Sequence, residues 1–579
     1  MQRGWTCEVR GSRGCACKTA AVTTSHWDLL TLIPDELPAV DLSVDHGEVF
    51  TRRWVVEMIL DLAGYTADRN LCQLRLVEPS CGQGAFLTVI AERVAASAGH
   101  HARTINDMAN AVRAFDLLGS HVDVARDAVA QVLIGHGIAP VDADVIARAW
   151  VIEDDYLLSD FESESADVVV GNPPYIRLED VGTARSAAYR RTWPTMGGRA
   201  DIFVGFFERG LRSLRPGGKL AFICADRWMR NQYGRDLREL IHRHFSMDVV
   251  VTMHDVDAFE DEVSAYPAVT VISNTKQGPA IVADTTARFG QGQARALVTY
   301  AKAEVSLTPP LSDAYKIAAL PHWFEGSTSW PQGSPERLAM IEYLADSFAP
   351  LEDRRTGTKV GIGVATGADK SFIVTNPPDV EPSRLLPMAM VRDLATGELK
   401  WSGHYLVSPW QEDGLVNLAD HPRLAAYYQG HEDALRRRHV AKNKAGWYRT
   451  IDRVDVKLTA RPKLLIPDMR MSIHPVLDDG QTYPHHNLYF VTSDRWDLRV
   501  LGGLLLSRVA NSFVEAYAVK MRGGTLRFQA QYLRRIRVPE LKSVCDKDAT
   551  ALALAFDRRD VDAATAVALR LYGLDDLPE

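Results

Sequence analysis

A tetrad of asparagine, two prolines and tyrosine directly follows an apolar run at residues 167–171. Asn172 and Pro173 offer two oxygens, one on a side chain and one on the backbone, and proline fixes the backbone that presents them. Both hydrogens of a planar exocyclic amine can bind there, which pulls its nitrogen toward the tetrahedral geometry needed to attack a methyl sulfonium. Pro174 continues the rigid turn, and Tyr175 adds an aromatic face on which an extruded base can stack. The tetrad therefore predicts methyl transfer to an amino group.

A bare proline-rich turn is the alternative interpretation, and the chain itself contains one. A second tetrad at 376–379 has aspartate in place of tyrosine and no apolar strand before it. It lacks both the aromatic face and the rigid support that hold a base. We interpret the second tetrad as a loop and the first as the candidate catalytic motif.

A second motif, E-P-S-C-G-Q-G-A-F-L, follows the apolar run L-R-L-V-E. Glycines at a strand-to-helix turn let the backbone approach a ligand closely. The loop matches neither a dinucleotide fingerprint nor a phosphate loop, so it suits a small nucleoside ligand without a pyrophosphate. Its glutamate can meet a cationic group such as an α-ammonium, although a glycine pair alone also fits a plain strand–turn–helix. The candidate ligand contacts are Glu78, Pro79, Cys81, Gly82 and Gly84.

Together the two motifs resemble the gamma group of amino-methylating DNA methyltransferases, the TaqI-like enzymes. In that family the cofactor motif comes first, the tetrad next and the target-recognition domain last. The resemblance spans residues 47–579 and is strongest over 47–275. It implies S-adenosylmethionine as cofactor, double-stranded DNA as partner and the N6 of a flipped adenine as methyl acceptor. It also implies a restriction-modification or phage-defence system, whose cognate endonuclease or other defence proteins would be further partners.

Further cofactor contacts follow from the resemblance. Thr51, in a G-E-V-F-T segment, matches the polar contact at the methionine end of the cofactor. Asp116 matches the acidic residue that binds the ribose hydroxyls, where glutamate is more common. Asp155 matches the acceptor for the adenine amine, with Asp154 as its rival in register, and Tyr156 lines the adenine ring.

The target base is the second ligand that the resemblance implies. Phe259 matches the second aromatic residue of the base pocket, with a bare loop phenylalanine as the alternative. The reaction is an in-line displacement at a sulfonium, so placement and charge stabilisation carry it and no metal is required. The predicted catalytic residues are Asn172, Pro173, Pro174, Tyr175 and Phe259.

These motifs need a sheet with crossover helices to position them. Strands are predicted at 74–78, 149–153, 166–171, 219–224, 247–252 and 268–273, with a weak strand at 111–115. Helices are predicted at 52–62, 85–96, 121–133, 202–214 and 235–245. We expect an α/β fold, a doubly wound Rossmann-like methyltransferase sheet with a C-terminal α+β target-recognition domain. The predicted division is an extension over 1–46, a catalytic domain over 47–275, a connector over 276–330 and the recognition domain over 331–579.

The extension contains Cys7, Cys15 and Cys17, with His26 behind them. Three cysteines and a histidine can ligate zinc, but the spacing fits no finger or ribbon pattern. We interpret the segment as a disordered leader or the product of an upstream start codon. The other cysteines are sparse and scattered, and neither a secretory signal nor an apolar run long enough to span a membrane is present, so we expect a cytoplasmic protein.

Charge is distributed unevenly along the chain. The net charge is −8, yet residues 431–542 hold 21 Lys and Arg against 11 Asp and Glu, a net of +10. Segments 359–374, 486–490 and 526–539 resemble parts of a TaqI-like recognition domain. We expect phosphate contacts in this half, although a solvated surface would explain any single arginine. The candidates are Arg436, Arg437, Arg438, Lys442, Lys444, Arg522, Arg527, Arg534, Arg535 and Arg537.

Other activities share parts of this pattern. The P-D…E-L-K pattern at 378–400 mimics a nuclease triad in spacing, but its loop-like context predicts no cleavage activity. Protein glutamine N5-methyltransferases share the tetrad but lack a long C-terminal domain. DNA cytosine-N4 methylation and an inactive DNA-binding relative stay open as alternatives. We expect a monomer.

Overall fold

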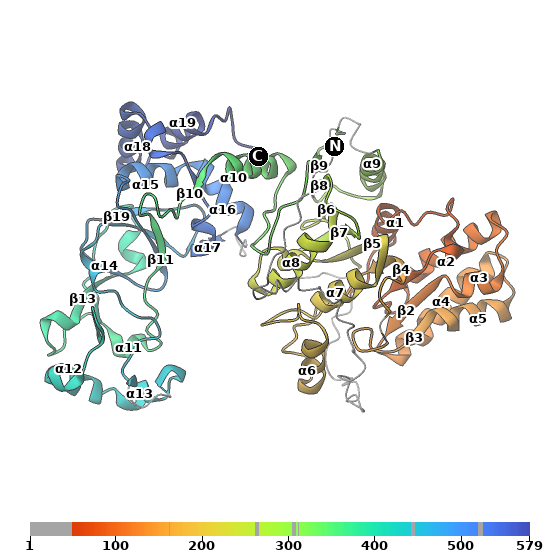
Figure 1. The fold of residues 1–579 in the computed structure, drawn as a ribbon, viewed down its shortest axis with the longest axis horizontal. Coiled ribbons are helices and arrows are strands. Elements are labelled where there is room, and N and C mark those ends of the chain that lie inside the picture. Colours follow the sequence, from red (N-terminus) through yellow and green to blue (C-terminus); the bar gives the residue numbers. More distant parts are fainter. Residues whose placement is uncertain are drawn as a thin grey trace, which may run out of the picture.

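The computed structural model describes residues 49–160, 162–260, 266–303, 309–310, 312–441, 446–518 and 525–578. These residues form two bodies, an N-terminal half built around one large sheet and a C-terminal half that begins at α10 (Pro335–Ser347) (Figure 1). The extension with its cysteine cluster lies outside the described residues. No helix among the described residues is both long and apolar enough to cross a membrane.

The sheet of the N-terminal half has nine strands in the order β3-β2-β1-β4-β5-β7-β6-β8-β9. Neighbours from β3 to β5 run parallel, and β7 is antiparallel between β5 and β6. The chain order reverses between β1 and β4, and such a switch point opens a crevice at the carboxyl ends of the strands. The strands are β1 (Leu76–Glu78), β2 (Val112–Asp116), β3 (Val151–Glu153), β4 (Ala166–Gly171), β5 (Leu214–Ala225), β6 (Ser246–Thr252), β7 (Pro267–Ser273), β8 (Ala280–Thr285) and β9 (Tyr315–Leu320).

Helices cover both faces of this sheet. Val168 and Val170 of β4 pack against one layer, whereas Val169 packs into the other. Because β4 is buried on both faces, it appears in the sequence as a continuous apolar run. One layer contains α1 (Arg53–Leu62), α2 (Ala85–His100), α3 (Ile105–Ala109), α4 (Gly119–Gly135), α5 (Pro140–Trp150) and α9 (Gln291–Lys302), and the other contains α6 (Thr183–Thr192), α7 (Phe203–Ser213) and α8 (Arg235–His244).

The predicted doubly wound α/β fold is confirmed, and every predicted strand and helix is present. Two differences in the limits stand out: β5 begins at residue 214 instead of 219, and residues 149–150 end α5 instead of opening β3. The sheet also continues past residue 275. Two strands and a helix from the expected connector, β8, β9 and α9, pack on its far edge.

The C-terminal half is α+β and contains two main four-stranded sheets. In the first, β11 (Lys359–Ile362), β21 (Leu488–Thr492), β17 (Lys463–Pro467) and β19 (Val476–Asp478) pair in that order. The second contains β12 (Ile373–Val374), β14 (Tyr405–Val407), β13 (Leu385–Ala389) and β20 (Tyr483–Pro484). Short pairs complete the half: β10 (Ala349–Pro350) with β23 (Arg537–Val538), β15 (Trp410–Gln411) with β16 (Gly414–Leu415), and β18 (Met469–Arg470) with β22 (Leu526–Arg527).

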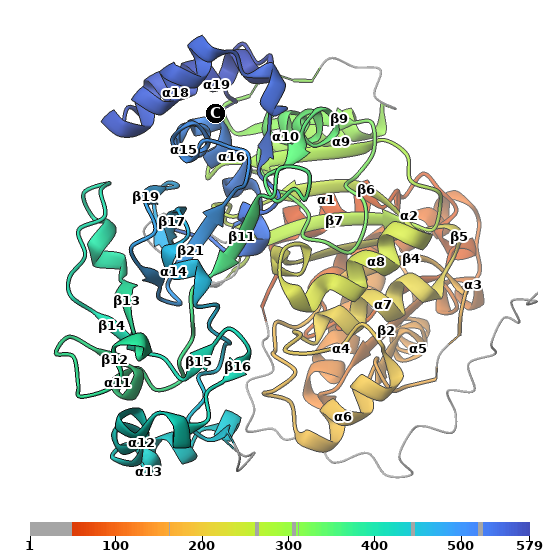
Figure 2. The same ribbon diagram turned by 60° about the vertical axis from the view of Figure 1, so that its left-hand side comes forward.

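Each sheet of this half has its own helices and core. The first packs against α10, α15 (Leu498–Leu506), α16 (Arg508–Tyr517), α17 (Ala530–Leu533), α18 (Asp546–Arg558) and α19 (Val561–Tyr572). The second packs against α11 (Asp369–Phe372), α12 (Pro422–Gln429), α13 (Glu432–Arg436) and α14 (Lys457–Ala460). Figures 1 and 2 both show α18 and α19 at one end of this half and α12 and α13 at the other.

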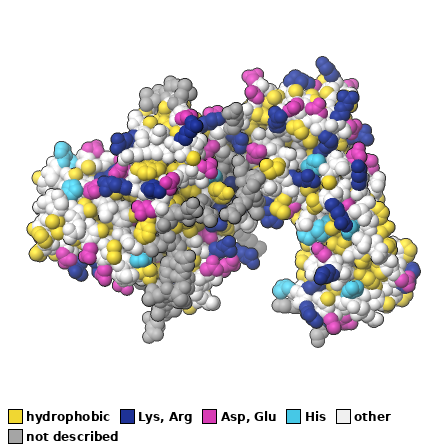
Figure 3. Space-filling view, turned by 180° about the vertical axis from the view of Figure 1, so that it is seen from behind, with side chains coloured by type: hydrophobic (Ala, Val, Ile, Leu, Met, Phe, Trp, Pro, Cys, Tyr) yellow, Lys and Arg dark blue, Asp and Glu magenta, His cyan; other side chains and the backbone are white. Residues whose placement is uncertain are grey.

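The segment before α10 joins the two halves. Trp330 donates its backbone N–H to Met229 of the sheet half over 2.8 Å, and its ring packs edge-on against Trp228. Gln332 donates its backbone N–H to Ala516 of the C-terminal half over 2.8 Å. Away from this junction the molecule is hollowed between the two halves, and Lys and Arg side chains lie on the C-terminal half beside the hollow (Figure 3).

Candidate active site

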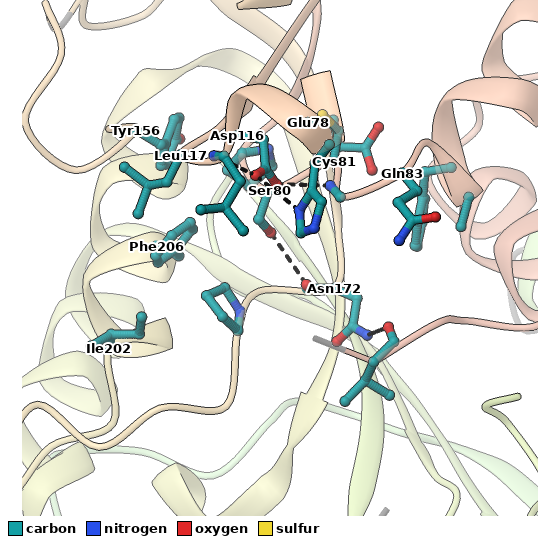
Figure 4. A pocket seen from close by; sticks show the side chains of 18 of the residues that line it. Glu78, Ser80, Cys81, Gln83, Asp116, Leu117, Tyr156, Asn172, Ile202 and Phe206 are labelled. Atoms are coloured by element: carbon teal, nitrogen blue, oxygen red, sulfur yellow. Dashed lines mark hydrogen bonds and ion pairs between the residues drawn. The ribbon is translucent and has the colours of Figure 1, made fainter. Parts of the chain in front are cut away.

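A cavity of about 950 Å³, partly open to solvent, lies at the carboxyl ends of β1 to β4. The loops that follow these strands line it, together with the segment before α1 and one face of α7. Figure 4 shows Tyr156, Phe206 and Ile202 on one side of the cavity and Glu78 on the other, with Asp116 between them. One end of the cavity is thus aromatic and apolar, while the middle and the opposite end are acidic.

Most of the predicted cofactor residues meet in this cavity. The lining includes Thr51, Glu78, Pro79, Cys81, Gly82, Asp116, Asp155, Tyr156, Asn172 and Pro174. Gly84, Pro173, Tyr175 and Phe259 lie outside the lining. Lining residues that the sequence did not indicate include His121, Tyr189, Ile202 and Phe206. His121, Ile202 and Phe206 lie on or next to predicted helices, and Tyr189 lies on α6, which was not predicted. Nothing in the spacing of these residues marks them as ligand contacts.

The glycines of the loop after β1 have different roles. Both adopt a positive φ, +50° at Gly82 and +96° at Gly84, a region that favours glycine. Gly82 lines the cavity and donates its N–H to the carboxylate of Asp116 over 2.9 Å. A Cβ on Gly84 would lie 3.4 Å from the Cα of Ala125, so this glycine lets α2 begin close against α4.

Glu78 ends β1 as a nearly inaccessible carboxylate, 1% exposed. Its Oε2 is buried without a hydrogen-bond partner among the described residues. Burial raises the pKa of Glu78 well above its usual value, and the nearby Asp116 adds to the rise. An acidic oxygen that is buried and unpaired is costly unless a ligand supplies the missing charge or donor.

Asp116 is held in one orientation at the end of β2. Its two oxygens accept the N–H groups of Gly82 and Leu118 over 2.9 and 3.0 Å, and the Nδ1 of His121 lies 3.3 Å away. A carboxylate has about four lone-pair sites. The residue therefore retains capacity for hydroxyl groups inside the cavity.

The acidic pair after β3 divides into a buried and an exposed member. Asp155 accepts the hydroxyl of Tyr189 over 2.8 Å and lies 3.6 Å from the guanidinium of Arg185, and burial raises its pKa. Asp154 is exposed at the rim. Tyr156 stacks on Phe206 with ring centroids 5.5 Å apart, which gives the cavity a flat aromatic wall.

The amide of Asn172 is oriented by the segment before α1. Its Nδ2 donates to the backbone oxygen of Val49 over 3.0 Å and to the hydroxyl of Thr51 over 3.2 Å. Its Oδ1 is buried and has no partner among the described residues. Ser80 donates to the Asn172 backbone carbonyl over 3.2 Å, which links the tetrad to the loop after β1 (Figure 4). The side chain thus presents an unused acceptor from a fixed position.

Tyr175 and Phe259 lie together beyond the cavity lining. Their ring centroids are 6.4 Å apart at an interplanar angle of 82°. Phe259 forms an isolated antiparallel bridge with Thr51, and the backbone of the adjoining residues also pairs, from Arg52 to Ala258 over 3.0 Å. The loop that carries Phe259 is therefore attached to the same segment that orients Asn172.

Several of the arginines predicted to bind phosphates have partners within the chain. Arg438, Arg534, Arg535 and Arg537 donate to backbone carbonyls over distances from 2.6 to 3.3 Å. Arg535 bonds to Ser329 in the junction between the halves. These hydrogen bonds stabilise the C-terminal half, whether or not the same arginines also contact phosphates.

Other candidates lie at the surface. Arg437 is exposed, Arg436 pairs with Glu432 over 2.6 Å, and Arg527 lies 3.5 Å from Asp468. Lys442, Lys444 and Arg522 lie outside the described residues. In the second tetrad, Asp379 pairs with Arg423 over 3.0 Å at the surface.

Comparison with known proteins adds family and fold information. Residues 104–259 match the family model described as Eco57I restriction-modification methylase. Type II methyltransferase M.PaeR7I of Pseudomonas aeruginosa is 44% identical, over 91% of this chain and 92% of its own. Type II methyltransferase M.XhoI of Xanthomonas vasicola is 42% identical, over 92% of this chain and 98% of its own.

A solved structure extends the likeness across both halves. The Type IIL restriction-modification enzyme MmeI, solved in complex with DNA, aligns with 91% of this chain and 74% of its own, at a TM-score of 0.52 and 11% identity. At that identity the likeness concerns the fold alone.

Proposed function

Because the chain belongs to the type II restriction-modification methyltransferases, whose cofactor is S-adenosylmethionine, we propose that it methylates the N6 amino group of an adenine flipped out of duplex DNA. The observation that carries this proposal is the unpaired, buried Oδ1 of Asn172 at the mouth of an acidic and aromatic cavity. DNA as the substrate and adenine N6 as the acceptor are the parts that need a test.

The cavity fits the cofactor at each of its three chemical parts. Glu78 would hold the cationic amino-acid end, because its unpaired oxygen needs a positive charge or donor. Asp116 is anchored where a carboxylate can accept ribose hydroxyls, and Tyr156 with Phe206 forms a wall for the adenine ring. When bound, the cofactor supplies an electrophilic methyl group on a sulfonium.

Asn172 would orient the amine that receives the methyl group. Its Nδ2 is already committed to Val49 and Thr51, so its Oδ1 accepts one amine hydrogen without a choice of rotamer. The Pro173 carbonyl would accept the second hydrogen. Two acceptors placed in this way direct the nitrogen lone pair at the methyl carbon, and such positioning lowers the barrier to an in-line displacement.

The target base would stack on Tyr175 with Phe259 at its side. Phe259 is buried and Tyr175 is half-buried, and their rings meet edge-on. Extruding a base from a duplex costs unstacking energy, which stacking of this kind offsets. Duplex DNA would occupy the hollow between the halves, with exposed arginines such as Arg437 contacting phosphates.

Asn172→Ala tests the proposal directly. We expect methylation of duplex DNA to fall by at least about 10²-fold, the order that a lost positioning or charge-stabilising contact costs, while S-adenosylmethionine and DNA binding stay within a few fold. Asn376→Ala, in the second tetrad, is the matched control and should leave turnover unchanged. Mass spectrometry of the digested product should find N6-methyladenine.

Each contrary outcome has a distinct meaning. Normal turnover by Asn172→Ala would refute the catalytic assignment. N4-methylcytosine in the digest would move the acceptor to cytosine. Methylated glutamine on a protein would replace DNA as the substrate, and binding of cofactor without any turnover by the wild type would indicate an inactive relative.

A further inference from the structure

Two histidines and an aspartate meet in the C-terminal half, far from the cavity at the end of the sheet. Among the described residues, Asp369, His485 and His486 form the cluster whose ligating atoms all lie within 4.8 Å of one another. The Oδ2 of Asp369 is 3.6 Å from the Nε2 of His485, and the two imidazole ring centroids are 4.0 Å apart. Three ligands at such separations can reach one ion at about 2.0–2.2 Å each after small side-chain shifts.

One ring nitrogen of each histidine has no other use within the described residues. The Nε2 of His485 and the Nδ1 of His486 are both buried and lack a hydrogen-bond partner. Buried ring nitrogens are normally satisfied, so two adjacent exceptions point to a missing ligand. Asp369 is half exposed, at 50% of its side chain, which leaves a position where water can complete the coordination.

The fold holds these ligands on separate segments. His485 lies between β20 and β21, its N–H donates to Ala389 over 3.1 Å, and its carbonyl accepts the N–H of Leu488 over 2.8 Å. A Cβ on Gly363 would lie 2.2 Å from the His485 carbonyl oxygen, so glycine is required for this close approach. Asp369 begins α11, and its Oδ1 accepts the hydroxyl of Thr366.

We propose that Asp369, His485 and His486 bind one divalent transition-metal ion, with Zn²⁺ the best match. Two imidazoles and a carboxylate suit Zn²⁺, Co²⁺ or Ni²⁺, whereas Mg²⁺ and Ca²⁺ prefer oxygen ligands alone. The ion ties the segment after β11 to the turn before β21, and so joins the two four-stranded sheets of the C-terminal half. This role is structural and lies outside the methyl-transfer reaction.

The test measures metal binding by the full chain after chelation and dialysis. We expect one Co²⁺ per chain, with visible d–d absorption of a nitrogen- and oxygen-ligated site, displaced by Zn²⁺. Asp369→Asn and His486→Ala should each weaken binding at least about tenfold, since even outer-shell changes cost that much. His439→Ala, at an exposed histidine of the same half, should bind Co²⁺ as the wild type does.

The cysteine-rich extension is a rival zinc site, so a separate variant removes it. Cys7→Ser, Cys15→Ser and Cys17→Ser combined should leave the stoichiometry and spectrum unchanged. Loss of binding in that variant, a thiolate charge-transfer band, or unchanged affinity in Asp369→Asn or in a folded His486→Ala would overturn the proposal. Asp369→Asn is nearly isosteric at a half-exposed position, so this variant should fold, and circular dichroism checks that it does. It therefore carries the test if His486→Ala does not fold.

Discussion

Within the part of the chain that the structure describes, two acceptors in the cavity of the sheet half lack hydrogen-bond partners, whereas several arginines of the C-terminal half already have them. In the cavity, the Oε2 of Glu78 and the Oδ1 of Asn172 are buried and have no partner among the described residues. In the C-terminal half, Arg438 and Arg535 already donate to two or more groups of the chain. Unpaired acceptors that line a cavity point to a ligand there, whereas a high density of positive charge in the sequence does not by itself indicate one.

The largest expected effect is a loss of cofactor affinity in the sheet half, on substitution of Glu78. Glu78→Gln keeps the size of the side chain and removes its charge. Because a buried carboxylate contributes strongly to the binding of a cationic ligand, the affinity for S-adenosylmethionine should fall on the order of 100-fold. Titration calorimetry measures this change. Glu153→Gln, at an exposed carboxylate that ends β3 outside the cavity lining, is the matched control. Equal affinities for the two variants would remove Glu78 from the site.

The raised pKa of Glu78 gives the same contact a pH dependence. Burial favours the neutral acid in the free protein, and a cationic ligand favours the carboxylate, so binding releases a proton. Cofactor affinity should therefore rise with pH until the free carboxyl is itself ionised, and Glu78→Gln should flatten this slope. A slope that persists in the variant would assign the proton to another group.

The next effect concerns the opposite half. Arg438 donates to the carbonyls of Leu435, Thr366 and Trp447 over 3.0, 2.8 and 2.9 Å. Arg438→Ala should lower the free energy of unfolding of this half by about 2 kcal/mol, because charged hydrogen bonds are lost and carbonyls are left unpaired. Urea unfolding followed by tryptophan fluorescence measures it. An unchanged midpoint together with weakened DNA binding would return Arg438 to the role that the sequence predicts.

Sequence motifs predicted the elements of the sheet half and many of the residues that line its cavity, because these signals are local in the sequence. Asn172 directly follows β4 and Glu78 is the last residue of β1, so an apolar run with a polar residue at its end indicates both the strand and the candidate site. His121 and Phe206 reach the same cavity from α4 and α7, where helical spacing alone cannot separate a ligand contact from a packed side chain.

The strands and side-chain contacts of the C-terminal half could not be predicted from the sequence, for two physical reasons. Many of its strands have only two or three residues, too short for a readable period. Composition counts the charge on Arg535 but not the Ser329 carbonyl that it binds across the junction. The cluster of Asp369 with His485 likewise exists only once the fold brings distant segments together.

A smaller effect is expected where the segment before α1 meets the side-chain amide of Asn172. Thr51→Val removes the hydroxyl that accepts from the Asn172 Nδ2, while Val49 still accepts. Because the amide is then less firmly oriented, turnover should fall roughly tenfold, consistent with the loss of about one hydrogen bond. Thr51→Ser should restore the rate, since it restores the hydroxyl. A defect confined to KM for S-adenosylmethionine would make Thr51 a cofactor contact and not a positioning residue.

The smallest effect is expected at Arg437, the exposed neighbour of Arg438. Arg437 is exposed next to Arg438, so the pair differs in partners but hardly in sequence position. Arg437→Ala should leave stability within about 0.5 kcal/mol, as for most surface substitutions. If its guanidinium contacts a phosphate, DNA affinity should fall a few fold on every sequence, and the slope of log affinity against log salt should decrease by about 1. Fluorescence anisotropy at several salt concentrations measures both. An unchanged slope would mean that the Arg437 guanidinium contacts no phosphate.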